Sequence, residues 1–391
     1  MELRRIGITW PLSDSHGWGV FGLNLALNLI RNGPTTPILF VDPQLLNPTE
    51  QTIAALTRFV QEGQQIAAQI QPLVKPVTFN EAVLIHVLYN DFTDEGLLEH
   101  TRGHHNVGFI FFENGEITPD AARRAAKWDR ILVGSTWNEQ LCKAAGIDDV
   151  VFVSQGIDTD LFKPAPPGDQ FQDRFVIFSG GKFELRKGQD IVLEAFKRFH
   201  QRHPDSLLIT AWQNHWPATI GSMMESPFVA SLPGVDSQGK LMIEAWAVAH
   251  GLPADAIVDS GWVANAVLPE LLHQADVALF PNRAEGGTNL AAMEAMACGI
   301  PCILSANSGH LDLIDDDNCY VLQEQTPGRF TDDPGGHWRS SSVDEILEKL
   351  EAAYVDSEAR KRRGGKGADF MKQLSWKNQV AKIVTAIEDF L

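Results

Sequence analysis

Short apolar runs alternate with helical patterns along the first part of the chain. These runs predict strands at residues 5–10, 38–41, 82–88, 107–112, 131–133 and 150–153. A loop and an apolar helix over residues 21–31 separate the first two runs. Buried parallel strands read as continuous apolar segments, and their connections are usually helices. The alternation therefore predicts a parallel sheet that is covered by helices on both faces.

A second series of the same kind begins at Phe175. Its strands and helices are predicted at residues 175–179, 189–200, 206–210, 257–260, 277–280, 290–298 and 301–304. The proline-rich stretch 164–169 lies between the two series and is typical of a linker, while residues 213–240 fit neither pattern and are interpreted as an insertion. We therefore expect an α/β chain of two doubly wound Rossmann-like domains, over residues 1–165 and 170–368, facing each other across a cleft.

Composition narrows the functional classes. The chain has 391 residues, of which 44% are hydrophobic, and its formal net charge of -18 would repel nucleic acid. It has no apolar stretch of about 20 residues. Pro11 and Asp14 interrupt the first apolar run too early for a signal peptide. We therefore expect no nucleic-acid partner, no transmembrane segment and a cytoplasmic location. The four cysteines are expected to be reduced, buried thiols: Cys142, Cys298, Cys302 and Cys319.

Residues 280–299 carry the strongest indication of chemistry. A predicted strand ends at Phe280, a loop with two glycines follows, and a helix begins near Asn289 and ends at Gly299. The unpaired amides and the dipole of such a helix start attract phosphate. Contacts to a phosphate-bearing ligand are therefore expected at Gly287, Thr288, Asn289 and Leu290.

Two carboxylates flank this helix start, Glu285 in the loop and Glu294 on the helix. Because Glu294 lies among Ala and Met residues, its carboxylate needs a polar partner, and a pair of ribose hydroxyls would supply one. The alternative is a capped core helix with two solvated glutamates.

With these residues the segment resembles the signature of the family-four retaining glycosyltransferases, or glycosyl transferases group 1. The resemblance implies the GT-B fold, a ribose contact for Glu294 and a place near the donor sugar for Glu285. It also implies that residues 369–391 contain a helix, beginning near Ser375, that returns to the N-terminal domain. The family's two glutamates are one residue closer together, so alignment on Glu294 places Gly286 where the first glutamate belongs. Either the loop absorbs the extra residue or Glu285 has lost that role.

A second segment follows the strand predicted at residues 175–179. Two glycines, including Gly181, precede three cations, Lys182, Arg186 and Lys187, and then a helix. Glycine allows close backbone approach, and cations placed there can neutralise a diphosphate. In the resemblance, Lys182 and Lys187 fall on the positions that grip the leaving diphosphate, so they are assigned as catalytic. The alternative is a solvated basic loop.

Two further loops are assigned to the ligand by the resemblance. After the strand at residues 257–260, Trp262 or Val263 would contact the nucleotide base, unless Trp262 is only a core residue. In the turn after the first strand, Gly17 or Gly19 would approach the donor phosphate.

The same turn carries His16 and Trp18, which are placed on the acceptor side, although plain packing explains Trp18 equally well. A glycine-rich turn of this kind is also a weak dinucleotide signal, for which Asp42 is the candidate ribose-binding acid. Glu113 follows the strand at residues 107–112 and is a further catalytic or acceptor-side candidate.

Metal-binding interpretations are weak in this sequence. His100, His104 and His105 cluster near a predicted helix end, where helical spacing could place two of them on one face. No cysteine or third ligand is near in the sequence, so polar surface is the better interpretation. Asp158 and Asp160 are interpreted as a turn before the linker. Activity is therefore expected to need no divalent metal, since Lys182 and Lys187 can carry the counter-charge.

These features predict a glycosyltransferase that uses a nucleotide sugar, such as a UDP- or GDP-sugar, and no cofactor, and the family resemblance implies that it retains the anomeric configuration. Its acceptor would be a hydroxyl on a glycan, a lipid-linked sugar or a small molecule. Two alternatives remain open at this point. A nucleotide-sugar epimerase on the same fold would convert the donor alone, and a catalytically degenerate module would bind the donor without turnover.

Overall fold

The computed structural model describes residues 5–33, 35–73, 75–94, 101–214 and 216–391. The chain divides into two compact units, the first made of residues 1–156 and 374–391 and the second of residues 157–373. The proline-rich stretch belongs to the second unit, where the amide of Gly168 donates to the carbonyl of His273 at 2.8 Å. The first unit therefore ends before this stretch.

The first unit is built on a six-stranded parallel sheet with the order β2-β1-β3-β4-β5-β6. Its strands are β1 (Arg5–Ile8), β2 (Pro37–Leu39), β3 (Val77–Val87), β4 (Thr101–Ile110), β5 (Arg130–Val133) and β6 (Val150–Phe152). The chain turns from β1 to β2 on one side and then to β3 on the other, so the topological switch point lies between β1 and β3.

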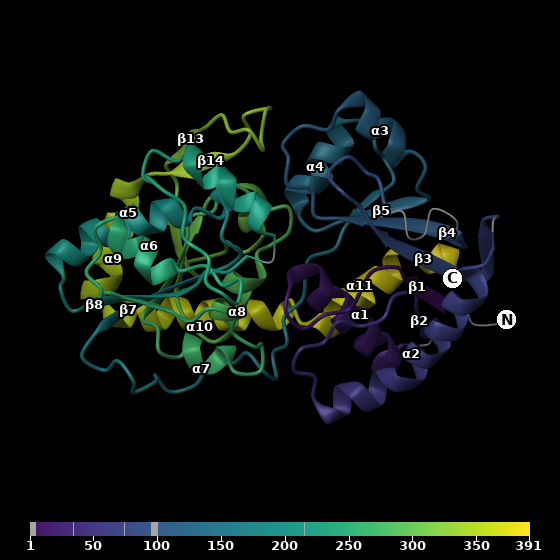
Figure 1. The fold of residues 1–391 in the computed structure, drawn as a ribbon, viewed down its shortest axis with the longest axis horizontal. Coiled ribbons are helices and arrows are strands. Elements are labelled where there is room, and N and C mark those ends of the chain that lie inside the picture. Colours follow the sequence, from purple (N-terminus) through teal and green to yellow (C-terminus); the bar gives the residue numbers. More distant parts are fainter. Residues whose placement is uncertain (1–4, 34, 74, 95–100, 215) are drawn as a thin grey trace. The chain divides into compact units, whose positions relative to one another are not determined.

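Helices pack on this sheet (Figure 1). They are α1 (Gly17–Asn32), α2 (Glu50–Ile70), α3 (Pro119–Ala125), α4 (Thr136–Ala144) and α11 (Trp376–Ala386). Ser375 caps α11 by accepting from the amide of Asn378, and the ring of Trp376 lies 5.8 Å from that of Phe21 on α1. This apolar contact attaches the last helix to the first unit.

The second unit has its own six-stranded parallel sheet, with the order β12-β11-β10-β7-β8-β9. Its strands are β7 (Phe175–Gly180), β8 (Ser206–Ala211), β9 (Ile257–Asp259), β10 (Val277–Phe280), β11 (Cys302–Ser305) and β12 (Tyr320–Leu322). Here the switch point lies between β7 and β10, where Phe178 pairs with Ala278. A ligand of an open parallel sheet binds outside the carboxyl ends of the strands at such a point.

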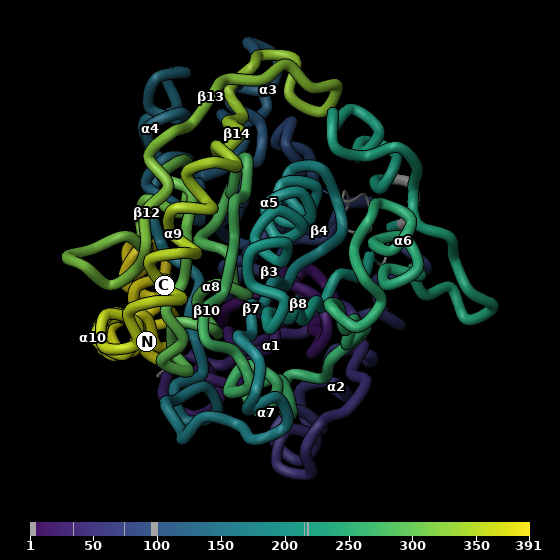
Figure 2. Tube along the Cα trace, turned by 90° about the vertical axis from the view of Figure 1, so that its left-hand side faces the viewer, coloured from purple at the N-terminus to yellow at the C-terminus, as the bar shows by residue number. Residues whose placement is uncertain are grey.

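The helices of the second unit are α5 (Gln189–Arg202), α6 (Ile243–Ala249), α7 (Leu268–Leu272), α8 (Leu290–Ala297), α9 (Val343–Val355) and α10 (Ser357–Gln373). The predicted insertion, residues 213–240, contains the 3-10 segment η3 (Pro217–Glu225). A small antiparallel hairpin, β13 (Gln325–Pro327) with β14 (Arg339–Ser341), lies apart from the six-stranded sheet (Figure 2).

Helix α8 is closed by a glycine. Gly299 adopts a φ of 80°, its amide donates to the carbonyl of Met296, and the next amide, of Ile300, reaches back to Ala295. This is the Schellman arrangement, which needs a residue that tolerates the left-handed conformation. A side chain on Gly364 of α10 would meet the carbonyl oxygen of Gly299 at 2.0 Å, so α10 packs directly on this helix end.

One prediction of local structure was wrong. Residues 101–110 form β4 and not a helix end, so His104 and His105 lie on a strand, while His100 lies outside the described residues. His105 stacks on Phe390 with ring centroids 4.3 Å apart. The early part of β3 is largely exposed, the early part of β4 consists of polar residues and glycine, and Val77 pairs with Thr101 beyond an irregularity in register. No apolar run marks this extension in the sequence.

The four cysteines are all free and buried. Among the described residues, none of the helices combines the length and the apolar character that crossing a membrane requires.

Candidate active site

The candidate site is built from two loops at the switch point of the second unit. One follows β7 and contains residues 181–188, and the other follows β10 and contains residues 281–289. The loops are in close backbone contact. Arg283 donates its amide to the carbonyl of Arg186 at 2.7 Å, and Gly188, with a φ of 75°, leaves no room for a side chain beside the carbonyl of Pro281.

The first loop alternates charged and apolar residues. Phe183 and Leu185 are fully buried in the core, while Lys182, Glu184 and Arg186 occupy the alternate positions. Glu184 is extended, and Leu185–Lys187 form a short 3-10 turn, so this loop carries all three charged side chains close to one another while Phe183 and Leu185 enter the core. The three charged side chains are therefore held together by the burial of their apolar neighbours.

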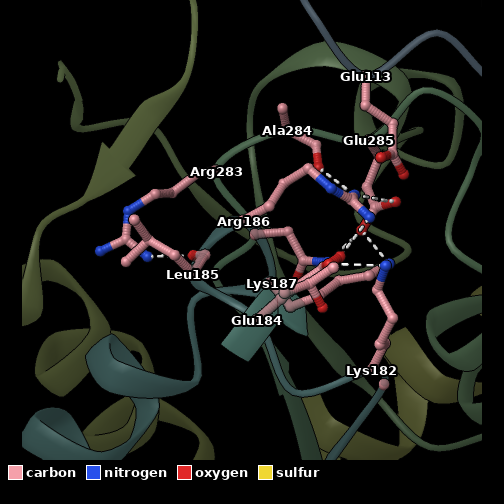
Figure 3. A network of polar contacts seen from close by, with 12 residues as sticks. Glu113, Lys182, Glu184, Leu185, Arg186, Lys187, Arg283, Ala284 and Glu285 are labelled. Carbon is pink, nitrogen blue, oxygen red and sulfur yellow. Dashed lines mark hydrogen bonds and ion pairs between the residues drawn. The ribbon is translucent and has the colours of Figure 1, made fainter. Parts of the chain in front are cut away.

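The charges form one continuous chain of ion pairs (Figure 3). Lys182 Nζ lies 2.7 Å from Glu184, whose other oxygen lies 2.6 Å from the Arg186 guanidinium. Arg186 continues to Glu285 at 3.1 Å, and the second oxygen of Glu285 lies 2.6 Å from Lys187 Nζ. Three cations thus share two carboxylates. The alternative of a solvated basic loop is wrong, since Arg186 is only 4% exposed.

Glu285 is ionised in this environment. Burial acts to raise the pKa of its carboxyl, but the charges of Lys187 and Arg186 outweigh burial and lower that pKa to about 2. The side-chain amide of Asn282 also donates to it. Glu285 therefore holds the two cations in place as a fixed negative charge.

Glu294 has the opposite character. It lies on α8 and is 8% exposed, and burial raises the pKa of its carboxyl to about 8. Within the described part of the chain its carboxyl has no hydrogen-bond or ion-pair partner. A buried carboxyl in this state is costly unless a ligand completes its hydrogen bonds.

The start of α8 lies where the sequence predicts it. Asn289 is the N-cap residue, with a φ of 68°, and Leu290 is the first helical residue. Thr288 is fully buried, with its hydroxyl 3.0 Å from the sulfur of Met293. Gly287 packs against Gly309, whose position has no room for a side chain.

The remaining predicted residues of this unit lie near the same strand edge. Gly181 follows β7 with a φ of 122° and is partly exposed. Trp262 is 48% exposed after β9, so it is not a core residue, and Val263 beside it is partly exposed.

The predicted residues of the first unit lie at the start of α1. His16 is the N-cap residue, and its Nδ1 accepts from the amide of Gly19 at 3.2 Å. Gly17 is exposed, and a side chain there would meet nothing within 4 Å. Gly19 is packed against Ser13, so only Gly17 offers open backbone.

Trp18 is partly exposed and belongs to an aromatic cluster. Its ring centroid lies 4.3 Å from that of Phe111 and 6.0 Å from that of Phe109. Packing therefore accounts for at least part of its role.

Glu113 follows β4 and is partly exposed. Its amide donates to the side chain of Asn90 at 3.1 Å. The side-chain amide of Asn138 on α4 makes two hydrogen bonds to the backbone of the preceding residue, Phe112.

The candidate ribose-binding acid of the dinucleotide interpretation, Asp42, is exposed beyond the end of β2 and accepts from the side chain of Gln64.

The described residues contain no group of three or more His, Cys, Asp or Glu side chains that could hold a metal ion. Asp158 accepts from the amides of Asp160 and Leu161, which is an Asx-type turn.

Sequence reasoning missed several residues that hold the site. Glu184 was visible in the charged-apolar alternation of the first loop. Trp216, from the insertion, has its ring 5.4 Å from Lys182 Nζ. Asp190 and His310 gave no signal, because their partners are far away in the sequence.

Two Rossmann-like units, each built on a parallel sheet, define the GT-B class of fold, and the second unit carries a basic loop and a helix start at its switch point. The solved structures agree with this class. Sucrose-phosphate synthase from Thermosynechococcus elongatus is 14% identical, with a TM-score of 0.64 and 99% of each chain covered. An Anabaena protein solved in complex with UDP and glucose is 12% identical, with a TM-score of 0.63 and coverage of 99% of this chain and 100% of that one.

The chain belongs to the family described as glycosyl transferases group 1, which matches residues 165–369. Among curated relatives, a D-inositol 3-phosphate glycosyltransferase of Paenarthrobacter aurescens is 23% identical over 70% of this chain and 62% of its own. A GDP-mannose-dependent alpha-(1-6)-phosphatidylinositol monomannoside mannosyltransferase of Mycolicibacterium smegmatis is 26% identical over 39% of this chain. The matches span 37% of the length of the second relative and 62% of the first.

Proposed function

We propose that the chain transfers a glycosyl group from a nucleotide-diphosphate sugar to a hydroxyl acceptor, with retention of anomeric configuration. The observation that carries this proposal is the chain of ion pairs from Lys182 to Lys187 at the switch point, together with a buried carboxyl on α8 that has no partner among the described residues. The family match supports the same class of reaction.

In this reaction the bond between the anomeric carbon and the diphosphate breaks, a bond to the acceptor oxygen forms, and the proton of that oxygen passes to the departing diphosphate. Negative charge grows on the departing diphosphate. Lys182 and Lys187 lie on one loop with their ammonium groups already held by Glu184 and Glu285. Such preorganised cations stabilise the leaving group without having to reorganise during the reaction.

The other contacts follow from the local geometry. The first turn of α8 has backbone N–H groups without intrahelical acceptors, and these suit the phosphates. Glu294 would accept or share hydrogen bonds with the two ribose hydroxyls. No side chain is assigned to a covalent intermediate, so the protein contributes positioning and charge stabilisation.

The donor is proposed to be a UDP- or GDP-hexose. The relatives support this range, since one is named for GDP-mannose and one solved neighbour holds UDP with glucose. The acceptor is proposed to be a hydroxyl of a small polyol phosphate, a glycan or a lipid-linked sugar. Inositol appears in the names of both curated relatives, so inositol phosphates are the first acceptors to test.

The test is a donor screen followed by product analysis. The purified protein is incubated with each UDP- and GDP-hexose, with and without inositol phosphates and glycosides as acceptors, and released nucleotide and product are measured. We expect nucleotide release that depends on an acceptor, and a product with the donor's anomeric configuration by NMR. Conversion of the donor alone would indicate an epimerase. Binding without turnover for all acceptors would indicate a binding module, and an inverted product would contradict retention.

A further inference from the structure

His310 is a fully buried polar residue outside the predicted site. It lies on the 3-10 segment η4 (Ser308–Asp312), directly after β11. Its ring contacts two side chains. Nδ1 lies 2.9 Å from Ser305 Oγ, and Nε2 lies 3.0 Å from the side-chain amide nitrogen of Asn289.

The donors in this cluster fix the direction of each hydrogen bond. Ser305 donates its hydroxyl proton to the carbonyl of Asn282 at 2.7 Å, so its oxygen accepts from Nδ1–H of His310. Nε2 is then left as an acceptor, which matches the amide group of Asn289. Only the neutral imidazole satisfies both contacts.

The partner, Asn289, has an unusual backbone. Its φ is 68°, in the left-handed region that side-chain-bearing residues rarely adopt, and it is the N-cap residue of α8. Its side chain makes no capping hydrogen bond to the helix. Instead the side chain is held by His310, so this contact offsets the cost of the left-handed conformation.

The same segment holds the other end of the loop. The hydroxyl of Ser308 accepts from the amide of Glu285 at 2.8 Å, and the amide of Gly309 donates to the carbonyl of Glu285 at 3.0 Å. Residues 305–310 therefore fix the loop between Glu285 and Asn289 at both ends. One turn further along α8 lies Glu294, whose buried carboxyl has no partner in the described part of the chain. This carboxyl marks the first half of the helix as a ligand site.

We propose that His310 is a positioning residue for nucleotide binding. By holding the side-chain amide of Asn289, it keeps the backbone at the start of α8 in the conformation that presents its N–H groups to a diphosphate. This inference rests on the proposed function, because it assumes that a nucleotide diphosphate binds there. His310 does not touch the ligand in this role.

The environment of His310 keeps its imidazole neutral, so that Nε2 remains a hydrogen-bond acceptor. Burial lowers the pKa of His310 to about 4, and although the carboxylate of Glu285 acts to raise it, the imidazole stays neutral near pH 7. Nε2 therefore accepts from Asn289 throughout the physiological range.

The test compares affinities for UDP and GDP by calorimetry in variants that separate the hydrogen bond from the packing. His310→Leu fills the space but cannot accept, and we expect its affinity to fall about tenfold, the range of one lost hydrogen bond. His310→Gln keeps an acceptor oxygen and should restore most of the affinity. Asn289→Gly adopts a positive φ without an anchor. Whatever nucleotide affinity this variant has, adding His310→Leu to it should lower that affinity little further.

A matched control is His200→Leu. His200 also has Nδ1 near a serine hydroxyl, at 3.0 Å from Ser206, but it lies on the last turns of α5, away from both loops of the site. This control should lower the melting temperature without changing nucleotide affinity.

Equal affinities of wild type and His310→Leu would overturn the positioning role, as would a His310→Gln variant as weak as His310→Leu. The positioning role would also be overturned if adding His310→Leu to Asn289→Gly lowered nucleotide affinity by the same factor as His310→Leu does in the wild type. If His310→Leu does not fold, Asn289→Ala replaces it, because alanine is strained at this φ, and binding equal to that of Asn289→Gly would contradict the inference. Failure of the wild-type protein to bind either nucleotide would instead overturn the proposed function itself.

Discussion

Arg283 and Asp190 form a buried, bidentate ion pair behind the site. The two guanidinium nitrogens of Arg283 lie 2.8 and 2.6 Å from the two carboxylate oxygens of Asp190, and both side chains are excluded from solvent. Arg283 comes from the loop after β10, and Asp190 opens α5. The pair therefore ties the second loop of the site to the helix that follows the first loop.

Breaking this pair should destabilise the second unit strongly. Asp190→Asn leaves the Arg283 charge buried without a counter-ion, and such a loss costs about 3–5 kcal/mol. The measurement is the free energy of unfolding of the second unit in urea. Arg198→Met is the control, because Arg198 pairs with Glu194 at the surface, where a pair contributes about 0–1 kcal/mol. Similar losses in the two variants would contradict a structural role for the buried pair.

Lys187→Ala should lower kcat by about 10²–10³, the range for one preorganised stabiliser of a developing charge. The effect on donor Kd should be smaller, since the interaction strengthens as the sugar leaves. Lys187→Arg should recover only part of the rate, because a guanidinium differs in shape from an ammonium. Steady-state kinetics and donor binding measure both quantities. Lys197→Ala, which removes a surface pair with Glu194, is the control. A near-normal kcat for Lys187→Ala would remove the main catalytic assignment.

Glu294 should release a proton when nucleotide binds. Its pKa of about 8 keeps most of the carboxyl protonated at pH 7, and hydrogen bonds donated by ribose hydroxyls would favour the charged form. Calorimetry in buffers of different ionisation enthalpy should therefore give different binding enthalpies. Glu294→Gln should lose this dependence. Glu294→Ala should weaken binding by about tenfold to a hundredfold, as expected for a charged hydrogen-bond partner worth about 1.5–3 kcal/mol. Unchanged affinity in a folded Glu294→Ala variant would make the ribose assignment wrong.

The raised pKa of Glu294 should also make the stability of the nucleotide-free protein depend on pH. Because its pKa is raised from 4.5 to about 8, the folded state keeps a proton that the unfolded state loses above pH 4.5. Its contribution therefore becomes less favourable as pH rises through this window. We expect Glu294→Gln to gain in melting temperature over the wild type between about pH 5 and pH 8. Parallel curves for the two proteins would show that the carboxyl is ionised in the folded state.

Activity should not require a divalent metal. Lys182 and Lys187 supply positive charge where a metal would otherwise neutralise the diphosphate. We expect turnover to persist in EDTA and to change little on addition of Mg²⁺ or Mn²⁺. Loss of turnover in EDTA that either ion restores would contradict this prediction.

Sequence patterns located the two loops of the site because each follows a buried strand and precedes a helix. The strand over Val277–Phe280 was predicted with its observed bounds, since all of its residues are apolar and buried. The pairing of Glu285 with Arg186 was not predictable, because it depends on the adjacency of β7 and β10, which are distant in sequence. The strand carrying His104 was missed for a different reason. Its first residues are polar or glycine, and they pair with β3 before β5 joins the other side of β4 at Val107.

The assignment of residues 374–391 to the first unit has a consequence for biosynthesis. Trp376 packs on Phe21, and Arg130 reaches the carbonyl of Ala386 and the carboxylate of Asp389, so the first unit lacks part of its core and surface until this segment arrives. A ribosome delivers that segment only after it has made all of the second unit. The contiguous second unit can therefore fold while the chain is still growing, whereas the first unit, although its strands emerge earlier, completes its packing last.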